Sequence, residues 1–212
     1  MRVLLAAAVC LGLAACNMEP IQSDPSGQEP PRSVIVQPDA KPGAPADVPV
    51  GDSDYTSEEI VKAASQALGQ TSESMALAVE RIFSRYGRPK AYIIGQEGGG
   101  AAVVGVRYGK GVLAYKGGGS MTVFWQGPSI GWDFGGNASK VFTLVYNLRN
   151  TYELFQRFPA VEGSLYVVAG VSVNYQQSGD IVLAPMRSGV GLRAGANLGY
   201  VHYTREASAI PF

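Results

Sequence analysis

The sequence predicts an α+β, mainly β protein. It would be a small soluble antiparallel β-barrel of about eight strands, with two N-terminal helices and one short helix inserted between strands. Three observations predict this fold. Apolar residues recur with a helical period between residues 55 and 90, and with a period of two from residue 91 onward. Glycines stand inside several later runs, where they allow the bends that closing a small barrel requires.

The first 16 residues, MRVLLAAAVCLGLAAC, are typical of a lipoprotein signal peptide. Arg2 precedes an uncharged run of 13 residues, Val3 to Ala15, which is shorter than the ~20 residues that a spanning helix needs. The run closes on Leu13-Ala14-Ala15-Cys16, which resembles a bacterial lipoprotein box and predicts that Cys16 is acylated. The alternative is an ordinary signal cleaved near Ala15 or later, with Cys16 incidental.

An acylated Cys16 would attach the protein to a membrane. Asn17, rather than aspartate, follows it, which favours the periplasm and the inner leaflet of the outer membrane of a Gram-negative bacterium. Residues 17–54 are rich in proline, serine, glycine and aspartate, so they predict a disordered tether that cannot bury enough apolar surface to fold. Cys10, the other cysteine, lies in the signal, so the domain predicted over residues 55–212 holds no disulfide and no thiol nucleophile.

Two helices are expected at the start of this domain. Thr56 and Glu59 form a capping box for the first, which ends at Gly69. The second begins at Thr71 or Ser72 and ends at Gly87. Apolar residues at helical spacing give each one buried face: Ile60, Ala64 and Leu68, then Met75, Val79, Ile82, Phe83 and Tyr86.

Short runs rich in β-branched and aromatic residues follow from Ala91 and predict strands. Glycine groups at 98–100, 109–111 and 117–119 separate the first runs, and Gly109-Lys110-Gly111 is expected to be a hairpin loop. NTYELFQRF predicts the inserted helix, with Asn150 as N-cap and Pro159 after its end. The later strand runs are GSLYVVAGVSVNY, DIVLAPM and GVGLRAGANLGYVHYTR.

GWDFGGNASKVFTLVYNL, residues 131–148, could be a phosphate-binding loop or a turn that leads into a strand. A P-loop needs a lysine directly after its last glycine and then a helix, but Lys140 stands four residues after Gly136 and precedes a β-branched run. A turn at Gly135-Gly136-Asn137 is therefore expected, with Lys140 exposed at a strand start. The formal net charge of +0 also argues against a nucleic-acid partner.

Possible ligand-binding residues are Lys140, Arg107, Arg193 and Trp132, since basic and aromatic side chains could hold an anionic lipid headgroup or a polysaccharide. Scattered solvated charge is the alternative interpretation. His202, the single histidine, is expected on a strand surface rather than as a lone general base. No catalytic residue, metal ligand or cofactor is predicted, and the sequence predicts no oligomeric state.

Long strings of this chain resemble the α-proteobacterial envelope-integrity family EipA. They include GRPKAYIIGQEGGGAAVVGVRYGKG, WQGPSIGWDFGGNASKVFTLVYNL and RSGVGLRAGANLGYVHYTR, within residues 55–212. The resemblance implies a periplasmic β-barrel domain of about eight strands that maintains the cell envelope, without established catalytic residues. Residues 130–146 and 189–199 also show a weaker, pattern-level similarity to SYLF (Ysc84-like) lipid-binding domains.

Three functions remain open from the sequence. The first is a non-enzymatic periplasmic lipoprotein that supports envelope integrity by binding a lipid, a glycan or an envelope protein. The second is a hydrolase that acts on envelope material, which would need a nucleophile and a base in one pocket. The third is an integral outer-membrane barrel ending at Phe212, which Pro211 and the two preceding helices disfavour.

Overall fold

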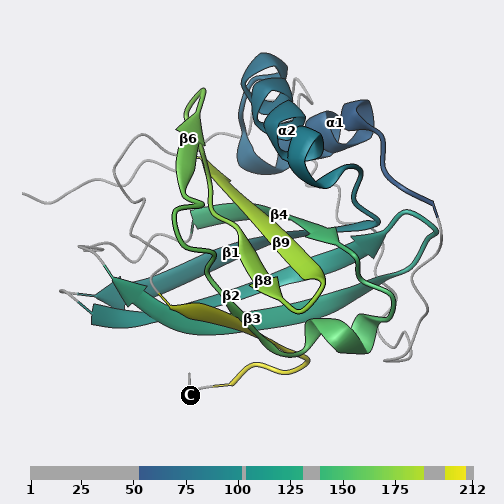
Figure 1. Cartoon of the computed structure of the whole chain (residues 1–212). Coiled ribbons are helices and arrows are strands. Elements are labelled where there is room, and N and C mark those ends of the chain that lie inside the picture. Colours follow the sequence, from purple (N-terminus) through teal and green to yellow (C-terminus); the bar gives the residue numbers. More distant parts are fainter. Residues whose placement is uncertain (1–52, 102–103, 131–138, 189–198, 209–212) are drawn as a thin grey trace, which may run out of the picture. The chain divides into compact units, whose positions relative to one another are not determined.

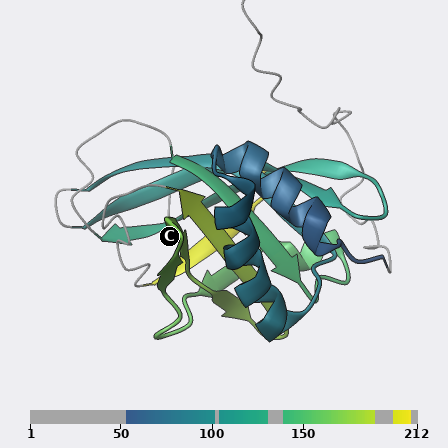
Figure 2. The same cartoon turned by 90° about the horizontal axis from the view of Figure 1, so that it is seen from above.

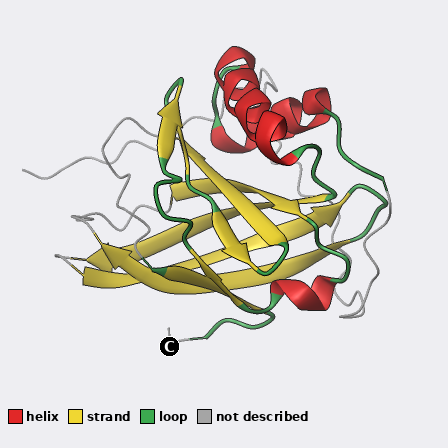
Figure 3. Cartoon of the chain, viewed as in Figure 1, coloured by secondary structure: helices red, strands yellow, loops and turns green. Residues whose placement is uncertain are grey.

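The computed structural model describes residues 53–101, 104–130, 139–188 and 199–208. All of them belong to one structural unit, 37–212. Two helices lie against a strongly curled sheet, and a short helical turn lies on the opposite side of that sheet (Figures 1 and 3). Within the described ranges, no helix combines the length and apolar character needed to cross a membrane.

The two helices begin and end where their capping residues predict. Helix α1 spans Ser57–Leu68, with a complete capping box between Thr56 and Glu59 and a left-handed Gly69 (φ 66°) at its end. Helix α2 spans Ser72–Tyr86, and the Thr71 side chain accepts a hydrogen bond from the Ser74 N–H. Both predictions are confirmed, because capping is a local interaction that the sequence displays directly.

Over the described residues the sheet has ten strands, and every pair of them is antiparallel. Its order is β5-β10-β3-β2-β1-β4-β9-β7-β6, and β8 also pairs with β9. The strands are β1 Ala91–Ala101, β2 Val104–Tyr115, β3 Ser120–Ile130, β4 Ser139–Tyr146, β5 Arg157–Pro159, β6 Tyr166–Val168, β7 Val171–Val173, β8 Gln176–Ser178, β9 Ile181–Ser188 and β10 Tyr200–Thr204.

The two ends of this curled sheet meet between β5 and β8. Ala160 forms an isolated bridge with Gln176, and the Val161 N–H donates to the Tyr175 carbonyl at 2.9 Å. The ring therefore runs β5, β10, β3, β2, β1, β4, β9, β8, which confirms the predicted barrel of about eight strands. The β6–β7 hairpin extends beyond this ring beside α2 (Figure 1).

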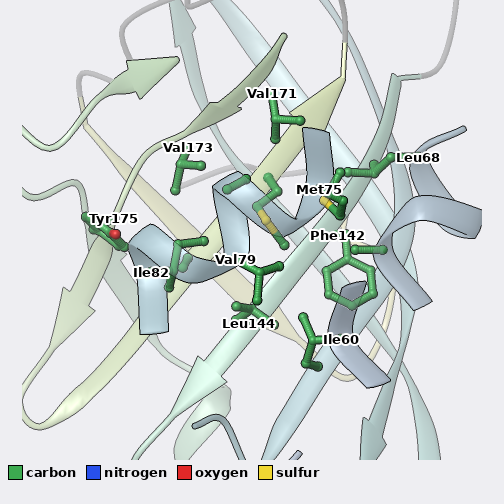
Figure 4. Close-up of a cluster of buried hydrophobic side chains, with 14 of the residues drawn as sticks. Ile60, Leu68, Met75, Val79, Ile82, Phe142, Leu144, Val171, Val173 and Tyr175 are labelled. Atoms are coloured by element: carbon green, nitrogen blue, oxygen red, sulfur yellow. The ribbon is translucent and has the colours of Figure 1, made fainter. Parts of the chain in front are cut away.

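One hydrophobic core lies between the helices and the outer face of β4, β7 and β9. Figure 2 shows both helices crossing this face, and Figure 4 shows the side chains that meet there. Among these residues are Ile60, Leu68, Met75, Val79, Ile82, Phe142, Leu144, Val171, Val173 and Tyr175. The helix stripes predicted from the sequence thus face the barrel wall.

The second core fills the inside of the barrel. It includes Ile93, Leu113, Val123, Trp125, Val141, Val145, Phe158, Leu183, Val201 and Tyr203. Because β4 and β9 contribute alternate residues to both cores, six consecutive residues of each are buried. This double burial explains why their sequences are continuous apolar runs rather than alternating ones.

The predicted hairpin at Gly109-Lys110-Gly111 is wrong, because these residues lie inside the continuous strand β2. A Cβ on Gly109 would come within 2.0 Å of Cε2 of the Trp125 indole, and a Cβ on Gly95 would lie 2.6 Å from the same ring. These two glycines therefore make room for a tryptophan inside the barrel. Gly98–Gly100 likewise belong to β1 instead of separating strands.

Two further boundaries differ from the prediction. The run GSLYVVAGVSVNY is a hairpin rather than one strand, since Ala169 (φ 48°) and Gly170 (φ 80°) form the turn between β6 and β7. The inserted helix is a 3₁₀ turn, η1, over Thr151–Leu154, capped by Asn150 as predicted. It is shorter than expected because Phe158 must enter the barrel on β5.

Candidate functional site

In the part of the barrel that the structure describes, side chains rather than an open cavity occupy the interior. The indole of Trp125 lies against Gly95 and Gly109, and its ring centroid is 5.7 Å from that of Tyr203. The Tyr203 ring packs edge-on against Phe158, with centroids 5.9 Å apart. The described interior is therefore a packed core, which leaves the outer surface as the place to look for a ligand.

The same interior holds an ionic cluster near the ends of β1 and β9. The Arg187 guanidinium donates two hydrogen bonds to Glu97, one from Nε to Oε1 and one from Nη2 to Oε2 at 3.2 Å. Nε of Arg107 lies 3.7 Å from Oε2 of Glu97, and Nε1 of Trp125 donates to the same oxygen at 3.2 Å. The Glu97 side chain is only 7% exposed.

These contacts fix Glu97 as a carboxylate. Burial alone would raise its pKa, but the Arg187 and Arg107 guanidiniums outweigh burial and lower the pKa to about 2. Burial lowers the pKa of Arg107, whereas for Arg187 the attraction of Glu97 exceeds the effect of burial and raises the pKa. A carboxylate whose pKa lies so far below neutral pH does not exchange protons during a reaction. The cluster therefore serves to hold the strands together.

An open groove of about 350 Å³ lies on the opposite, outer face of β1, β2 and β3. Side chains of both aromatic and polar type line it: Gln96, Tyr108, Lys110, Phe124, Gln126 and, from the segment after β10, Ser208. Tyr108 is 39% exposed, which is high for so large an aromatic side chain. A concave surface that combines apolar walls with a few converging polar groups is the usual form of a ligand site.

Strand register explains why these side chains meet. Gln96 on β1 stands opposite Lys110 on β2, and Lys110 stands opposite Phe124 on β3. The Lys110 ammonium lies 5.7 Å from the centroid of the Phe124 ring. On the other side, Gln96 stands opposite Lys140 on β4. A row of outward-facing residues therefore crosses four strands as Lys140, Gln96, Lys110 and Phe124.

The residues predicted as ligand contacts fall into three groups. Lys140 is exposed at the start of β4 and lies on the same face as the groove. Arg107 is inside the barrel beside Glu97, away from that face. Trp132, Arg193 and the acylation residue Cys16 lie outside the described residues. The structure therefore associates Lys140, but not Arg107, with the groove.

Sequence reasoning missed Gln96, Tyr108, Lys110, Phe124 and Gln126. All five have even residue numbers on three neighbouring strands. Because side chains alternate between the two faces of a sheet, the register of these strands places all five on the same face. The sequence prediction could not place them together, because a loop at residues 109–111 divides β2 into two separate strands and so loses its register with β1 and β3.

Other polar residues on the sheet and its loops have ordinary surroundings. His202 is on the outer face of β10 opposite Gln126, and burial followed by the nearby Arg157 charge lowers its pKa. Asp180 forms an exposed ion pair with Arg149 at 3.0 Å. In the ranges that the structure describes, no group of histidine, cysteine, aspartate and glutamate side chains could hold a metal ion.

Comparisons with known proteins identify relatives of the whole folded part. The family model of envelope integrity protein A matches residues 53–212. A crystal structure of a β-barrel-like, uncharacterized protein from Brucella abortus is 46% identical and covers 75% of this chain and 99% of its own, with a TM-score of 0.69. No curated protein matches.

Proposed function

The chain belongs to the envelope integrity protein A family, and from that premise we propose that it is a non-enzymatic lipoprotein that supports envelope integrity by binding an envelope component on the outside of its barrel. The observation that carries this proposal is the packed interior. Trp125, Tyr203 and Phe158 fill the space that a ligand of a hollow barrel would occupy.

The chemistry of the buried ionic cluster favours binding over catalysis. Glu97, with its pKa lowered to about 2 by the two arginines, is unsuited to acid–base work near neutral pH. The groove on β1–β3 offers aromatic, amide and ammonium groups, which recognise ligands through contact and hydrogen bonding. A binding role for the outer face therefore fits the described residues better than hydrolysis.

In this proposal Cys16 carries the acyl chains, and the protein is held at the periplasmic side of the outer membrane. The 38 residues from 17 to 54 would act as a flexible tether. A coil of that length has a root-mean-square span of roughly 30–40 Å, enough for the domain to search the space next to the membrane. Radiolabelled palmitate should mark the wild-type protein and leave Cys16→Ser unmarked. An equally labelled Cys16→Ser protein would overturn the anchor.

Complementation tests the binding role. Cells that lack the protein should become sensitive to a membrane-active detergent, and the wild-type gene should restore survival. We expect Lys110→Glu combined with Lys140→Glu to fail to restore it at normal protein level, because both changes lie on the groove face. The control is Lys62→Glu, a charge reversal at another exposed lysine, on α1. Full rescue by the double variant would contradict a role for this face.

A further inference from the structure

We propose that the groove face binds an acidic polysaccharide, a glycan chain whose sugars carry carboxylates at regular intervals. The proposal rests on the binding role inferred above and names the ligand class of the same face. The surface concerned consists of Tyr108, Lys110, Phe124, Gln96 and Lys140.

The walls of the groove suit a sugar ring. The exposed ring of Tyr108 and the half-buried ring of Phe124 offer flat apolar surfaces for the C–H face of a pyranose. On the neighbouring strand β1, the Gln96 amide can donate and accept hydrogen bonds, as sugar hydroxyls require. At about 350 Å³ the groove lies at the small end of ligand sites, which suits one or two sugars of a chain that continues beyond it.

The charge of the face selects an acidic chain. Lys110 and Lys140 flank Gln96 on its two neighbouring strands, and no carboxylate is among the residues that line the groove. Glu97 follows Gln96 in sequence, but strand alternation sends its carboxylate into the barrel, where Arg187 holds it. The outer face therefore keeps two ammonium groups available for anions.

The spacing of the lysines favours a repeating ligand. They stand two strands apart, roughly 9.5 Å between backbones. A β-1,4-linked chain in which every second sugar carries a carboxylate repeats on a similar length scale, so two successive carboxylates can reach the two lysines. Such a chain is a peptidoglycan glycan strand from which the stem peptides have been removed, because the lactyl carboxyl of alternate sugars is then a free carboxylate rather than an amide.

Two other occupants fit less well. An extended acidic peptide would need a free strand edge for backbone pairing, but at the groove residues β1, β2 and β3 are each paired on both sides. A lipid would need a deep apolar slot for its acyl chains, whereas this groove is open and carries amide and ammonium groups on its walls.

Calorimetric titration of the mature full-length chain in mild detergent tests the inference. The probes are soluble, peptide-free glycan fragments of peptidoglycan, whose lactyl carboxylates are free, and chitin oligosaccharides of equal length, which share the backbone but lack carboxylates. We expect the peptidoglycan fragments to bind at least tenfold more tightly, and their binding to weaken with added salt. Equal affinity for the two probes, or no binding of either, would overturn the inference.

Variants locate the binding. Lys110→Glu with Lys140→Glu should raise the Kd for the peptidoglycan fragments at least tenfold, and Tyr108→Ala should weaken both probes. Lys62→Glu, on α1, should bind as the wild type does. Thermal unfolding checks that each variant is folded, which their exposed positions favour. Wild-type affinity in the double-lysine variant would refute the proposed contacts.

Combining titration with complementation separates this inference from the proposed function. If neither probe binds but the double-lysine variant still fails to protect cells, the glycan is wrong and the binding role of the face stands. If the variant loses glycan binding yet protects cells fully, the function proposed for this face falls as well.

Discussion

Replacing Glu97 with glutamine should reveal how strongly the ionic cluster inside the barrel stabilises the fold. The substitution keeps the shape of the side chain but leaves Arg107 and Arg187 facing an uncharged group. In the folded protein the pKa of Glu97 falls from its ordinary 4.5 to about 2. Each unit of pKa difference between the folded and unfolded states corresponds to ~1.36 kcal/mol, so the ionised carboxylate stabilises the fold by about 3 kcal/mol at pH 7.

The dependence on pH follows from the direction of that pKa change. A lowered pKa means that the stabilisation is fully present above the unfolded pKa, and is lost as the pH falls from about 5 towards 2. Wild type and Glu97→Gln should therefore differ by about 3 kcal/mol in unfolding free energy at pH 7, within the range for breaking a buried ion pair. The difference should shrink steadily below pH 5.

Urea unfolding measured by tryptophan fluorescence at several pH values provides the assay, because urea does not screen charges. Asp180→Asn is the matched control, since its ion pair with Arg149 is exposed and should contribute less than ~1 kcal/mol. The reasoning is refuted if Glu97→Gln unfolds within about 1 kcal/mol of wild type at pH 7. It is refuted equally if the difference persists undiminished at pH 2.

Three further substitutions test other parts of the fold by the same unfolding measurement. Gly109→Ala should destabilise by at least ~1–3 kcal/mol, because its methyl group would clash with the Trp125 indole, and an unchanged midpoint would contradict that packing. Thr56→Ala removes the N-cap of α1 and should cost ~0.5–2 kcal/mol, whereas a neutral result would mean that the cap adds nothing. Tyr146→Phe should be neutral or slightly stabilising, since the buried Tyr146 hydroxyl has no hydrogen-bond partner among the described residues; a loss above ~1 kcal/mol would reveal one.

Local signals in the sequence were sufficient for the helices and for most strand positions. The Thr56–Glu59 capping box and the left-handed Gly69 act within a few residues, so they can be read without knowing the fold. The glycines of β2 could not be interpreted in this way. Position 109 requires a glycine because any side chain there would clash with the indole of Trp125. Trp125 lies 16 positions further along the chain, and only the pairing of β2 with β3 brings the two residues together.

The candidate site shows the same limit. The sequence predicts Lys140 as an exposed charge at a strand start, and the structure places it on the groove face. Its neighbours Gln96 and Lys110 come from two other strands, and only the register decides that they share a face. Side chains alternate along β2, so Arg107 points inward to Glu97, whereas its neighbour Tyr108 points outward to the groove.

The junction between β5 and β8 gives the barrel a weak point. Elsewhere around the ring, neighbouring strands share at least three register pairs. Among the described residues, the β5–β8 junction has one isolated bridge, the Val161 backbone hydrogen bond and a side-chain hydrogen bond from Ser178 to Gln156. We expect local unfolding to begin at this junction, because few hydrogen bonds hold it, while the long strands β1, β2 and β3 remain paired. In deuterated water the Val161 amide should consequently lose its proton far sooner than the central amides of β2, and the tryptophan side of the barrel should stay protected throughout.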